Sequence, residues 1–243
     1  MQWLARIKWV GVVILGLLTA CQAGGHSMRA SELFEPPVVA VLESIQKGDE
    51  SAARHQLSQG VNLNIQDKKA VTLALKLGVD PNYKDGFGDS AVNSVAGAKD
   101  PDWLRIILDA GGDPNAIGRR GQPAIFSAIN EQRWADIKLL VEKGADLNLE
   151  DQNKRNSALY AAYVNEYEIV YWLIEQGASF DTYSSTGSSL AWRVHDSLSI
   201  MSPKSPHYPW ALKVKQLLLE RGVKFPPLSP TEVRERWEKG EPL

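Results

Sequence analysis

The chain has 243 residues, of which 44% are hydrophobic and 23% are charged. This is the composition of one or two globular domains and excludes a disordered chain. The formal net charge of −2 argues against a nucleic-acid-binding protein, since such proteins usually carry a strongly basic domain. A single cysteine excludes an internal disulfide, and none of the four histidines lies at a metal-ligand spacing from another, so we expect no metal and no cofactor.

The first 20 residues predict a signal peptide. Arg6 and Lys8 make a basic start without acidic residues, and an apolar run follows over residues 9–20. This run is too short to cross a membrane as a helix, which needs about 20 residues. It ends with the four residues Leu18-Thr19-Ala20-Cys21.

These four residues resemble the lipobox of bacterial lipoproteins. The resemblance implies that Cys21 becomes the first residue of the mature chain and carries acyl chains such as palmitate, which anchor it stably to a membrane. In this family an aspartate after the cysteine often marks retention in the inner membrane. Gln22 stands there instead, so the resemblance favours the periplasmic face of the outer membrane. The alternative is a plain signal peptide in which the cysteine occurs by chance.

The segment after the cleavage site, residues 21–38, predicts a flexible tether behind the lipidated cysteine. Gly24 and Gly25 lie there among small and polar residues. Removal of residues 1–20 takes away two of the 27 basic residues and none of the 29 acidic ones. The mature chain therefore has a formal net charge of −4.

Glycines recur at regular distances along the rest of the chain. A glycine just after the last turn ends a helix because it tolerates the left-handed conformation. The successive spacings are 18, 33, 33, 33 and 45 residues. The glycines are Gly60, Gly78, Gly111, Gly144, Gly177 and Gly222.

An apolar stripe at helical spacing precedes three of these glycines, which predicts three amphipathic helices in the same place of successive units. The stripes are Leu104, Ile107 and Leu108; Ile137, Leu140 and Val141; and Val170, Leu173 and Ile174. Each unit also has a first helix that opens near a small residue, at Ser90-Ala91, Pro123-Ala124 and Ser157-Ala158. The third opening is displaced by one residue, so we expect the loop before it to be one residue longer.

The period of 33 and these openings resemble the ankyrin repeat family, whose first helix opens with a Thr-Pro-Leu-His signature. The resemblance covers roughly Val39 to Phe225 and implies an all-α solenoid of stacked helix pairs with short hairpin fingers. We therefore expect four segments. They are a signal peptide (1–20), a lipidated cysteine and tether (21–38), an ankyrin-repeat array (39–225) and a C-terminal capping segment (226–243).

Two spacings depart from the period of 33, and each carries its own prediction. Residues Leu42–Asn64 read as an opening repeat, and the spacing of 18 after it leaves room for one helix, Lys69–Leu77, which we expect to be a weak joint. The spacing of 45 contains 12 extra residues, and the proline-rich stretch Ser202–Pro209 predicts a loop between the two helices of the last unit.

The C-terminal segment predicts a short capping helix. Ser229, Pro230 and Glu232 have the types expected at the N-cap, the first position and the third position of a helix with a capping box. Gly240 is placed to end this helix. We expect the helix to hold Trp237 against the last repeat, whose outer face has no neighbour.

The sequence contains no nucleophile–base pair and no phosphate-binding loop, so we expect no catalytic residue. His195 on a first helix is a lone candidate base, and a structural role explains it better. The ankyrin resemblance instead implies that a protein partner binds the finger tips and the adjoining first helices. The candidate partner-binding residues are Tyr83, Phe87, Arg119, Arg120, Asn130, Glu131, Lys154, Arg155 and Tyr183.

Aromatic and arginine side chains favour this interpretation because they are the types that most often anchor interfaces. Basic residues recur on consecutive fingers, so positive charge would be concentrated along one edge of a chain that is acidic overall. The alternative is an ordinary solvated hairpin edge. The basic residues are Lys68, Lys69, Lys84, Arg119, Arg120, Lys154 and Arg155.

The order of lipobox, tether and degenerate repeats resembles ankyrin-type lipoproteins of Gram-negative bacteria, some of which are immunity proteins encoded beside type VI secretion phospholipase effectors. The function expected is that of a periplasm-facing, membrane-anchored protein-binding lipoprotein. In its most specific form it neutralises a secreted phospholipase-type effector. The alternative is a structural scaffold lipoprotein that holds an envelope enzyme at the membrane. Neither function involves a nucleic acid.

Overall fold

The computed structural model describes most of the chain from residue 80 onward and scattered residues before it. The described residues are 36–37, 39–40, 44, 49, 51–52, 55–56, 68, 71–72, 75, 80–85 and 87–243. The predicted signal peptide, Cys21 and most of the tether lie outside them, as do nearly all of Leu42–Asn64 and most of Lys69–Leu77. Among the described residues, no helix has the length and apolar character needed to cross a membrane.

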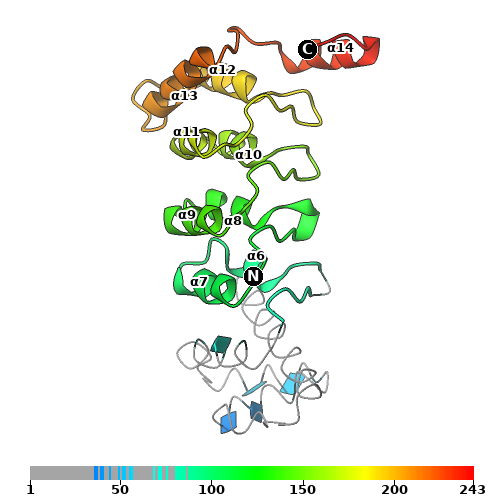
Figure 1. The fold of residues 1–243 in the computed structure, drawn as a ribbon, viewed down its shortest axis with the longest axis vertical. Helices are drawn as coiled ribbons and strands as arrows, with labels where there is room; N and C mark the ends of the chain where they lie inside the picture. Colours follow the sequence, from blue (N-terminus) through cyan, green and yellow to red (C-terminus); the bar gives the residue numbers. More distant parts are fainter. Residues whose placement is uncertain are drawn as a thin grey trace. The chain divides into compact units, whose positions relative to one another are not determined.

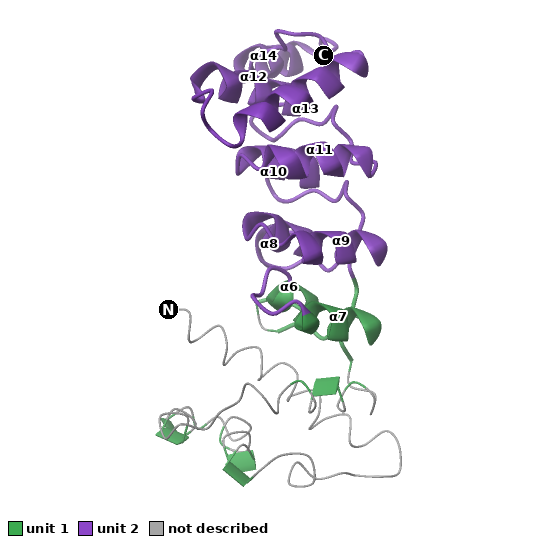
Figure 2. Ribbon diagram, turned by 90° about the vertical axis from the view of Figure 1, so that its left-hand side faces the viewer, with its two compact units in different colours: residues 1–95, 102–113 green, residues 96–101, 114–243 purple. Residues whose placement is uncertain are grey.

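The chain divides into two compact units (Figure 2). Unit 1 contains residues 1–95 and 102–113, and unit 2 contains residues 96–101 and 114–243. In unit 1, the short helix α6 (Ala91–Val95) packs against α7 (Asp102–Asp109).

Unit 2 stacks three helix pairs, with the first helix of each pair next to a hairpin and the second helix on the other side (Figure 1). No strand occurs in the part of the chain that the structure describes, apart from isolated bridges in the hairpins. The pairs are α8 (Ala124–Asn130) with α9 (Trp134–Glu142), α10 (Ser157–Tyr163) with α11 (Tyr167–Glu175), and α12 (Leu190–Ile200) with α13 (Tyr208–Glu220).

The predicted apolar stripes form the core of these pairs. Of the nine stripe residues, all but the half-buried Val141 are at most 5% exposed. Burial of each such side chain contributes about 1.5–3 kcal/mol relative to exposure. The amphipathic pattern therefore identified the buried face of α7, α9 and α11.

The helix-ending role of the glycines is confirmed at the four that the structure describes, Gly111, Gly144, Gly177 and Gly222. Each has a φ between 87° and 98°, in the left-handed region that favours glycine. In each case the glycine N–H donates to the carbonyl three residues earlier, and the next N–H donates to the carbonyl five residues earlier. These two bonds make a Schellman motif, which satisfies the last carbonyls of the helix.

The first helices begin at Ala91, Ala124, Ser157 and Leu190, so each start follows the previous one by 33 residues. The expected displacement by one residue at Ser157 is therefore wrong. Asn156 is the N-cap of α10, and its Oδ1 accepts a 3.0 Å hydrogen bond from the Leu159 N–H. Asparagine meets the need for an N-cap acceptor as well as serine does, so the small Ser157 falls inside the helix.

The 12 extra residues of the last repeat are spread over three places. Helix α12 has 11 residues against seven in α10, and α13 has 13 against nine in α11. The loop between α12 and α13, residues 201–207, takes up the rest. The predicted loop is therefore confirmed up to His207, but Tyr208 and Pro209, which were expected in it, belong to α13. Pro209 lies in the first turn of α13, where its missing N–H is tolerated.

The predicted C-terminal helix is α14 (Pro230–Lys239). Its capping box is present, because Ser229 Oγ accepts from the Glu232 N–H and Glu232 Oε2 accepts from the Ser229 N–H at 2.8 Å. The hydrogen bonds from Ser229 lower the pKa of Glu232. Gly240 ends the helix with a φ of 67°, as predicted.

Candidate binding edge

Four hairpin fingers begin at positions that are 33 residues apart. In each finger the first residue donates its N–H to the carbonyl four residues later, at 2.9–3.0 Å. Finger 1 belongs to unit 1, and fingers 2, 3 and 4 belong to unit 2. We define finger 1 by its described residues 85 and 87–89, finger 2 as 118–122, finger 3 as 151–155 and finger 4 as 184–188.

The first residue of a finger shapes its turn. Asp151 Oδ1 accepts the N–H groups of Asn153 and Arg155 at 2.9 and 3.0 Å, and Asp85 does the same in finger 1. Ser184 Oγ accepts the N–H of the residue four positions later in finger 4. Finger 2 begins with Gly118, which has no such side chain, and a short 3-10 turn, η1 (Arg119–Gly121), forms there instead.

Fingers 2, 3 and 4 contact one another in sequence. The Ser185 N–H donates to the Asn153 carbonyl at 2.8 Å, which joins fingers 4 and 3. A Cβ atom on Gly121 would lie 3.3 Å from Gln152 Cγ, so fingers 2 and 3 also touch. The three tips therefore form one continuous edge of unit 2, which we call the finger edge.

Asparagine side chains fix the register below the fingers. Asn115 Oδ1 accepts the Asp146 N–H at 2.6 Å, and Asn115 Nδ2 donates to the Gly144 carbonyl at 3.3 Å. Asn148 Oδ1 accepts the Ser179 N–H at 2.8 Å one repeat later. Each repeat is thus tied to the helix-ending glycine loop of the next, which holds the fingers at a constant spacing.

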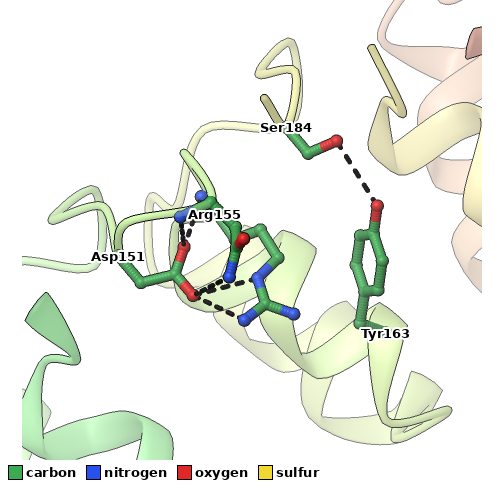
Figure 3. Close-up of polar contacts among 5 residues, drawn as sticks. Asp151, Arg155, Tyr163 and Ser184 are labelled. Atoms are coloured by element: carbon green, nitrogen blue, oxygen red, sulfur yellow. Dashed lines mark hydrogen bonds and ion pairs between the residues drawn. The ribbon is translucent and has the colours of Figure 1, made fainter. Parts of the chain in front are cut away.

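A buried ion pair supports finger 3 (Figure 3). Arg155 Nε donates to Asp151 Oδ2 at 3.0 Å, and Asp151 is only 4% exposed. Burial opposes ionisation of Asp151, but the hydrogen bonds from Arg155 outweigh it and lower the pKa of this carboxyl. The Arg155 guanidinium also lies 5.1 Å from the ring centres of both Tyr160 and Tyr163. Arg155 is therefore held inward and shapes the finger.

Tyr163 continues this cluster to finger 4. Its hydroxyl donates to Ser184 Oγ at 3.3 Å (Figure 3). The Arg193 guanidinium of α12 lies 4.7 Å from its ring centre. Burial raises the pKa of Tyr163, but hydrogen bonding to Ser184 and the neighbouring hydroxyls lowers it overall. Tyr163 thereby attaches α10 to both finger 4 and α12.

Comparison with known families decides what these repeats are. Residues 92–184 match the family model described as ankyrin repeats, in three copies. Residues 92–184 are ankyrin repeats. The predicted all-α ankyrin class is confirmed, and ankyrin repeats indicate a module for protein–protein interaction. No curated protein matches the chain.

Three of the predicted binding residues lie exposed at the tips of the ankyrin fingers in unit 2. Arg119 and Arg120 occupy the turn of finger 2, and Lys154 occupies the tip of finger 3. Lys154 Nζ lies 3.3 Å from a Glu150 carboxylate oxygen, but its side chain remains 66% exposed. The finger edge therefore presents cations on two adjacent fingers.

Lys154 adopts a left-handed φ of 60° at the position where the other three fingers have Gly88, Gly121 and Gly187. Lysine at such a position costs about 1–2 kcal/mol, whereas glycine loses about 0.5–1 kcal/mol in chain entropy. We therefore expect Lys154→Gly to raise the free energy of unfolding by about 0.5–1 kcal/mol. The measurement is urea unfolding followed by circular dichroism.

Gln152→Gly is the matched control, since Gln152 lies two positions earlier in the same finger and has no positive φ. We expect this control to lose about 0.5–1 kcal/mol. A stability change of the same sign in both variants would show that the left-handed conformation of Lys154 carries no strain.

The predicted aromatic residues fall in different units. In unit 1, Tyr83 precedes finger 1 and is 40% exposed, and Phe87 lies within finger 1 and is 55% exposed. Tyr183 precedes finger 4 in unit 2 and is half-buried, because the Trp237 ring of α14 lies edge-on to it at 6.2 Å. Trp237 is thus held against the last repeat, as predicted.

Asn130 and Glu131 do not join the finger tips. Asn130 is the last residue of α8 and Glu131 follows it, and the Asn130 Nδ2 donates to Glu131 Oε1 at 3.2 Å. A helix of seven residues is about 10 Å long at about 1.5 Å per residue, so these exposed residues lie a helix length from finger 2. They belong to the inner-helix surface beside the edge.

Arg234 is a further residue of this surface that is absent from the predicted binding residues. This residue of α14 is exposed, and its Nη1 donates to the Thr186 carbonyl of finger 4 at 2.7 Å. Gly187 could not have indicated the contact by itself, because Gly88 and Gly121 occupy the same position of fingers 1 and 2. Within the described residues, no group of three or more histidine, cysteine or acidic residues is arranged to hold a metal ion.

Proposed function

We propose that the mature chain is a periplasm-facing lipoprotein, anchored through Cys21, whose ankyrin fingers bind a protein partner. The observation that carries the binding role is the finger edge. It presents Arg119 and Arg120 on finger 2 and Lys154 on finger 3, on an otherwise acidic chain. Fingers 2 and 3 pack against each other, and finger 3 is hydrogen-bonded to finger 4. The lipobox at residues 18–21 supports the anchor.

Such an edge suits a partner with an acidic surface. Clustered cations steer an oppositely charged protein toward the edge and align it during the encounter. The fingers are held in place by the Asn115 and Asn148 bridges and by the Asp151–Arg155 pair, so little chain entropy is lost when a partner binds.

In its most specific form the partner is a secreted phospholipase-type effector, and the chain is the immunity protein that covers its active-site mouth. The order of lipobox, tether and ankyrin repeats supports this form, because the resemblance is to lipoproteins with that role. An outer-membrane anchor would place the finger edge in the compartment where such an effector acts. A neighbouring gene without a lipase-type product would count against the immunity form.

The test of the binding role is the double variant Arg119→Glu/Arg120→Glu. Reversal of two exposed cations replaces attraction by repulsion, and we expect about tenfold weaker binding. The measurement is protection of cells that co-express the effector encoded beside the chain, together with its dissociation constant. Raised salt should weaken wild-type binding and reduce the difference between the two proteins.

The matched control is Lys138→Glu/Lys213→Glu, which changes the net charge equally on the outer helices α9 and α13. We expect less than about a twofold effect from it. Circular dichroism checks that both variants fold. Full protection by a folded Arg119→Glu/Arg120→Glu variant would exclude the finger edge as the binding surface.

The anchor has its own prediction. Cys21→Ser removes the thiol to which acyl chains attach, so we expect the variant to lose fatty-acid labelling and to leave the detergent phase. The measurement combines labelling with a clickable palmitate analogue and membrane fractionation. Equal fractionation of wild type and variant, with no label in either, would contradict the lipoprotein proposal.

A further inference from the structure

Helix α14 lies against finger 4 (Figure 1). Val233 is the one fully buried residue of the helix, and it faces Gly187 at the finger tip. A Cβ atom on Gly187 would lie 2.7 Å from the Pro230 carbonyl oxygen and 3.2 Å from Val233 Cγ1. Only glycine allows this approach, and its φ of 84° favours glycine as well.

The contact places one particular side chain at the tip of finger 4. Arg234 Nη1 donates to the Thr186 carbonyl at 2.7 Å, and its Nη2 donates to Thr231 Oγ1 at 3.2 Å. The guanidinium is thus held in a fixed position while the residue remains exposed. Finger 4 itself has only serine, threonine and glycine at 184–188 and supplies no charge.

The line of contacts along the edge therefore does not stop at finger 4. Gly121 packs on Gln152 in finger 3, the Asn153 carbonyl accepts from Ser185 in finger 4, and the next residue, Thr186, accepts from Arg234. Cationic side chains thus occur on finger 2 and on finger 3. Finger 4 has no cationic residue of its own, and Arg234 of α14 provides one at its tip.

We infer that Arg234 completes the finger edge as a partner-binding residue, and that the completed edge fits an acidic segment of a protein partner. The inference rests on the proposed function and adds a residue to the same surface. Of the carboxylates nearby, Asp151 is neutralised by Arg155, Glu150 lies against Lys154, and Glu232 is occupied in the capping box. Glu235 is exposed on α14 next to Arg234.

Trp237 follows Arg234 by three residues on α14, so the Tyr183–Trp237 pair lies on the same side of the helix and adds an apolar surface next to Arg234. Trp237 is 43% exposed although its ring contacts Tyr183. A partner segment that pairs its acidic groups with Arg234 would cover this ring. Half-buried aromatic rings beside an arginine are typical of interface anchors.

The experiment measures binding of a fluorescein-labelled polyglutamate peptide of about 20 residues, long enough in extended form to reach along several fingers. Fluorescence anisotropy at low salt gives the dissociation constant for the mature chain and its variants. We expect Arg234→Glu to weaken binding about three- to tenfold. Lys239→Glu makes the same charge change elsewhere on α14, and we expect less than a twofold effect from it.

Gly187→Ala tests whether the position of Arg234 matters for binding when its charge is unchanged. This variant keeps every charge but obstructs the docking of α14, so we expect it to weaken peptide binding about as much as Arg234→Gln does. Circular dichroism checks that the repeats of both variants remain folded. Unchanged binding by Gly187→Ala would show that docking of α14 does not contribute.

The remaining outcomes are distinct. If Arg234→Glu binds like wild type while Arg119→Glu/Arg120→Glu is weakened, this inference fails and the finger edge stands. If neither variant is weakened, or wild type does not bind the peptide, both fail. Equal weakening by Arg234→Glu and Lys239→Glu would show that net charge, not position, controls binding. Equal or tighter binding of a labelled 20-nucleotide oligothymidylate would overturn the assignment of an acidic protein.

Discussion

Replacement of Leu173 by alanine is expected to lower the free energy of unfolding by about 2–5 kcal/mol. Leu173 lies on α11, which packs against both α10 and α13, and its side chain is fully buried. The alanine removes apolar atoms from the contact between two successive repeats and leaves a cavity, so the transfer and cavity contributions add. Urea unfolding followed by circular dichroism measures the loss.

Leu219→Ala is the control for this variant. The same atoms are removed from α13, but Leu219 is 43% exposed. We expect a loss of less than about 1 kcal/mol. Similar losses at the two positions would contradict the assignment of the apolar stripe on α11 as the core of the array.

Asp151→Asn is expected to lower the free energy of unfolding by about 2–3 kcal/mol, the second large effect. Asparagine keeps an Oδ1 acceptor for the finger N–H groups but leaves the Arg155 guanidinium without its counter-charge. That guanidinium side chain is only 16% exposed and lies between two tyrosine rings, so water cannot fully replace the carboxylate.

Asp85→Asn is the matched control, because Asp85 makes the same two turn hydrogen bonds in finger 1. The residue four positions later there is Asp89, whereas finger 3 has Arg155, so no such ion pair is broken. We expect a loss below about 1 kcal/mol. A loss as large as that of Asp151→Asn would show that the turn bonds, and not the ion pair, hold finger 3.

The Asp151 pair also predicts a pH dependence. Because the pKa of Asp151 is lower in the folded chain than its ordinary value of 3.8, its stabilisation is complete above about pH 5 and declines as the pH falls below 4 through the folded pKa. The stability difference between wild type and Asp151→Asn should therefore shrink in acid. Burial raises the pKa of Asp136, which acts in the opposite direction, but this group is present in both proteins and cancels.

The repeats could be predicted from the sequence because their signals are local. Gly144 and Gly177 end helices through their own backbone freedom, and the stripe containing Leu140 shows which face is buried. The error at Ser157 has a local cause too. A small residue was taken as the helix opening, although Asn156 before it provides the better N-cap.

The edge could be predicted only in part, because exposure and docking depend on contacts between distant residues. The residue type and position of Arg155 predict an exposed cation at the finger tip, but its pairing with Asp151 and its contact with the Tyr160 ring hold it inward. Arg234 lies 48 residues from Thr186 in the sequence, so no local pattern connects them. Gly187 and the capping box at Ser229 can be recognised in the sequence, but only the fold shows that the helix begun at Ser229 packs against Gly187.

The most direct test of the finger edge as a protein-binding surface is position-specific photocrosslinking in cells that express the full chain. Benzoylphenylalanine replaces Lys154 on finger 3, Arg234 on α14, or Lys138 on the outer helix α9. The account predicts an adduct with the same protein from positions 154 and 234 and none from 138. Adducts from position 138 with none from 154 would contradict it.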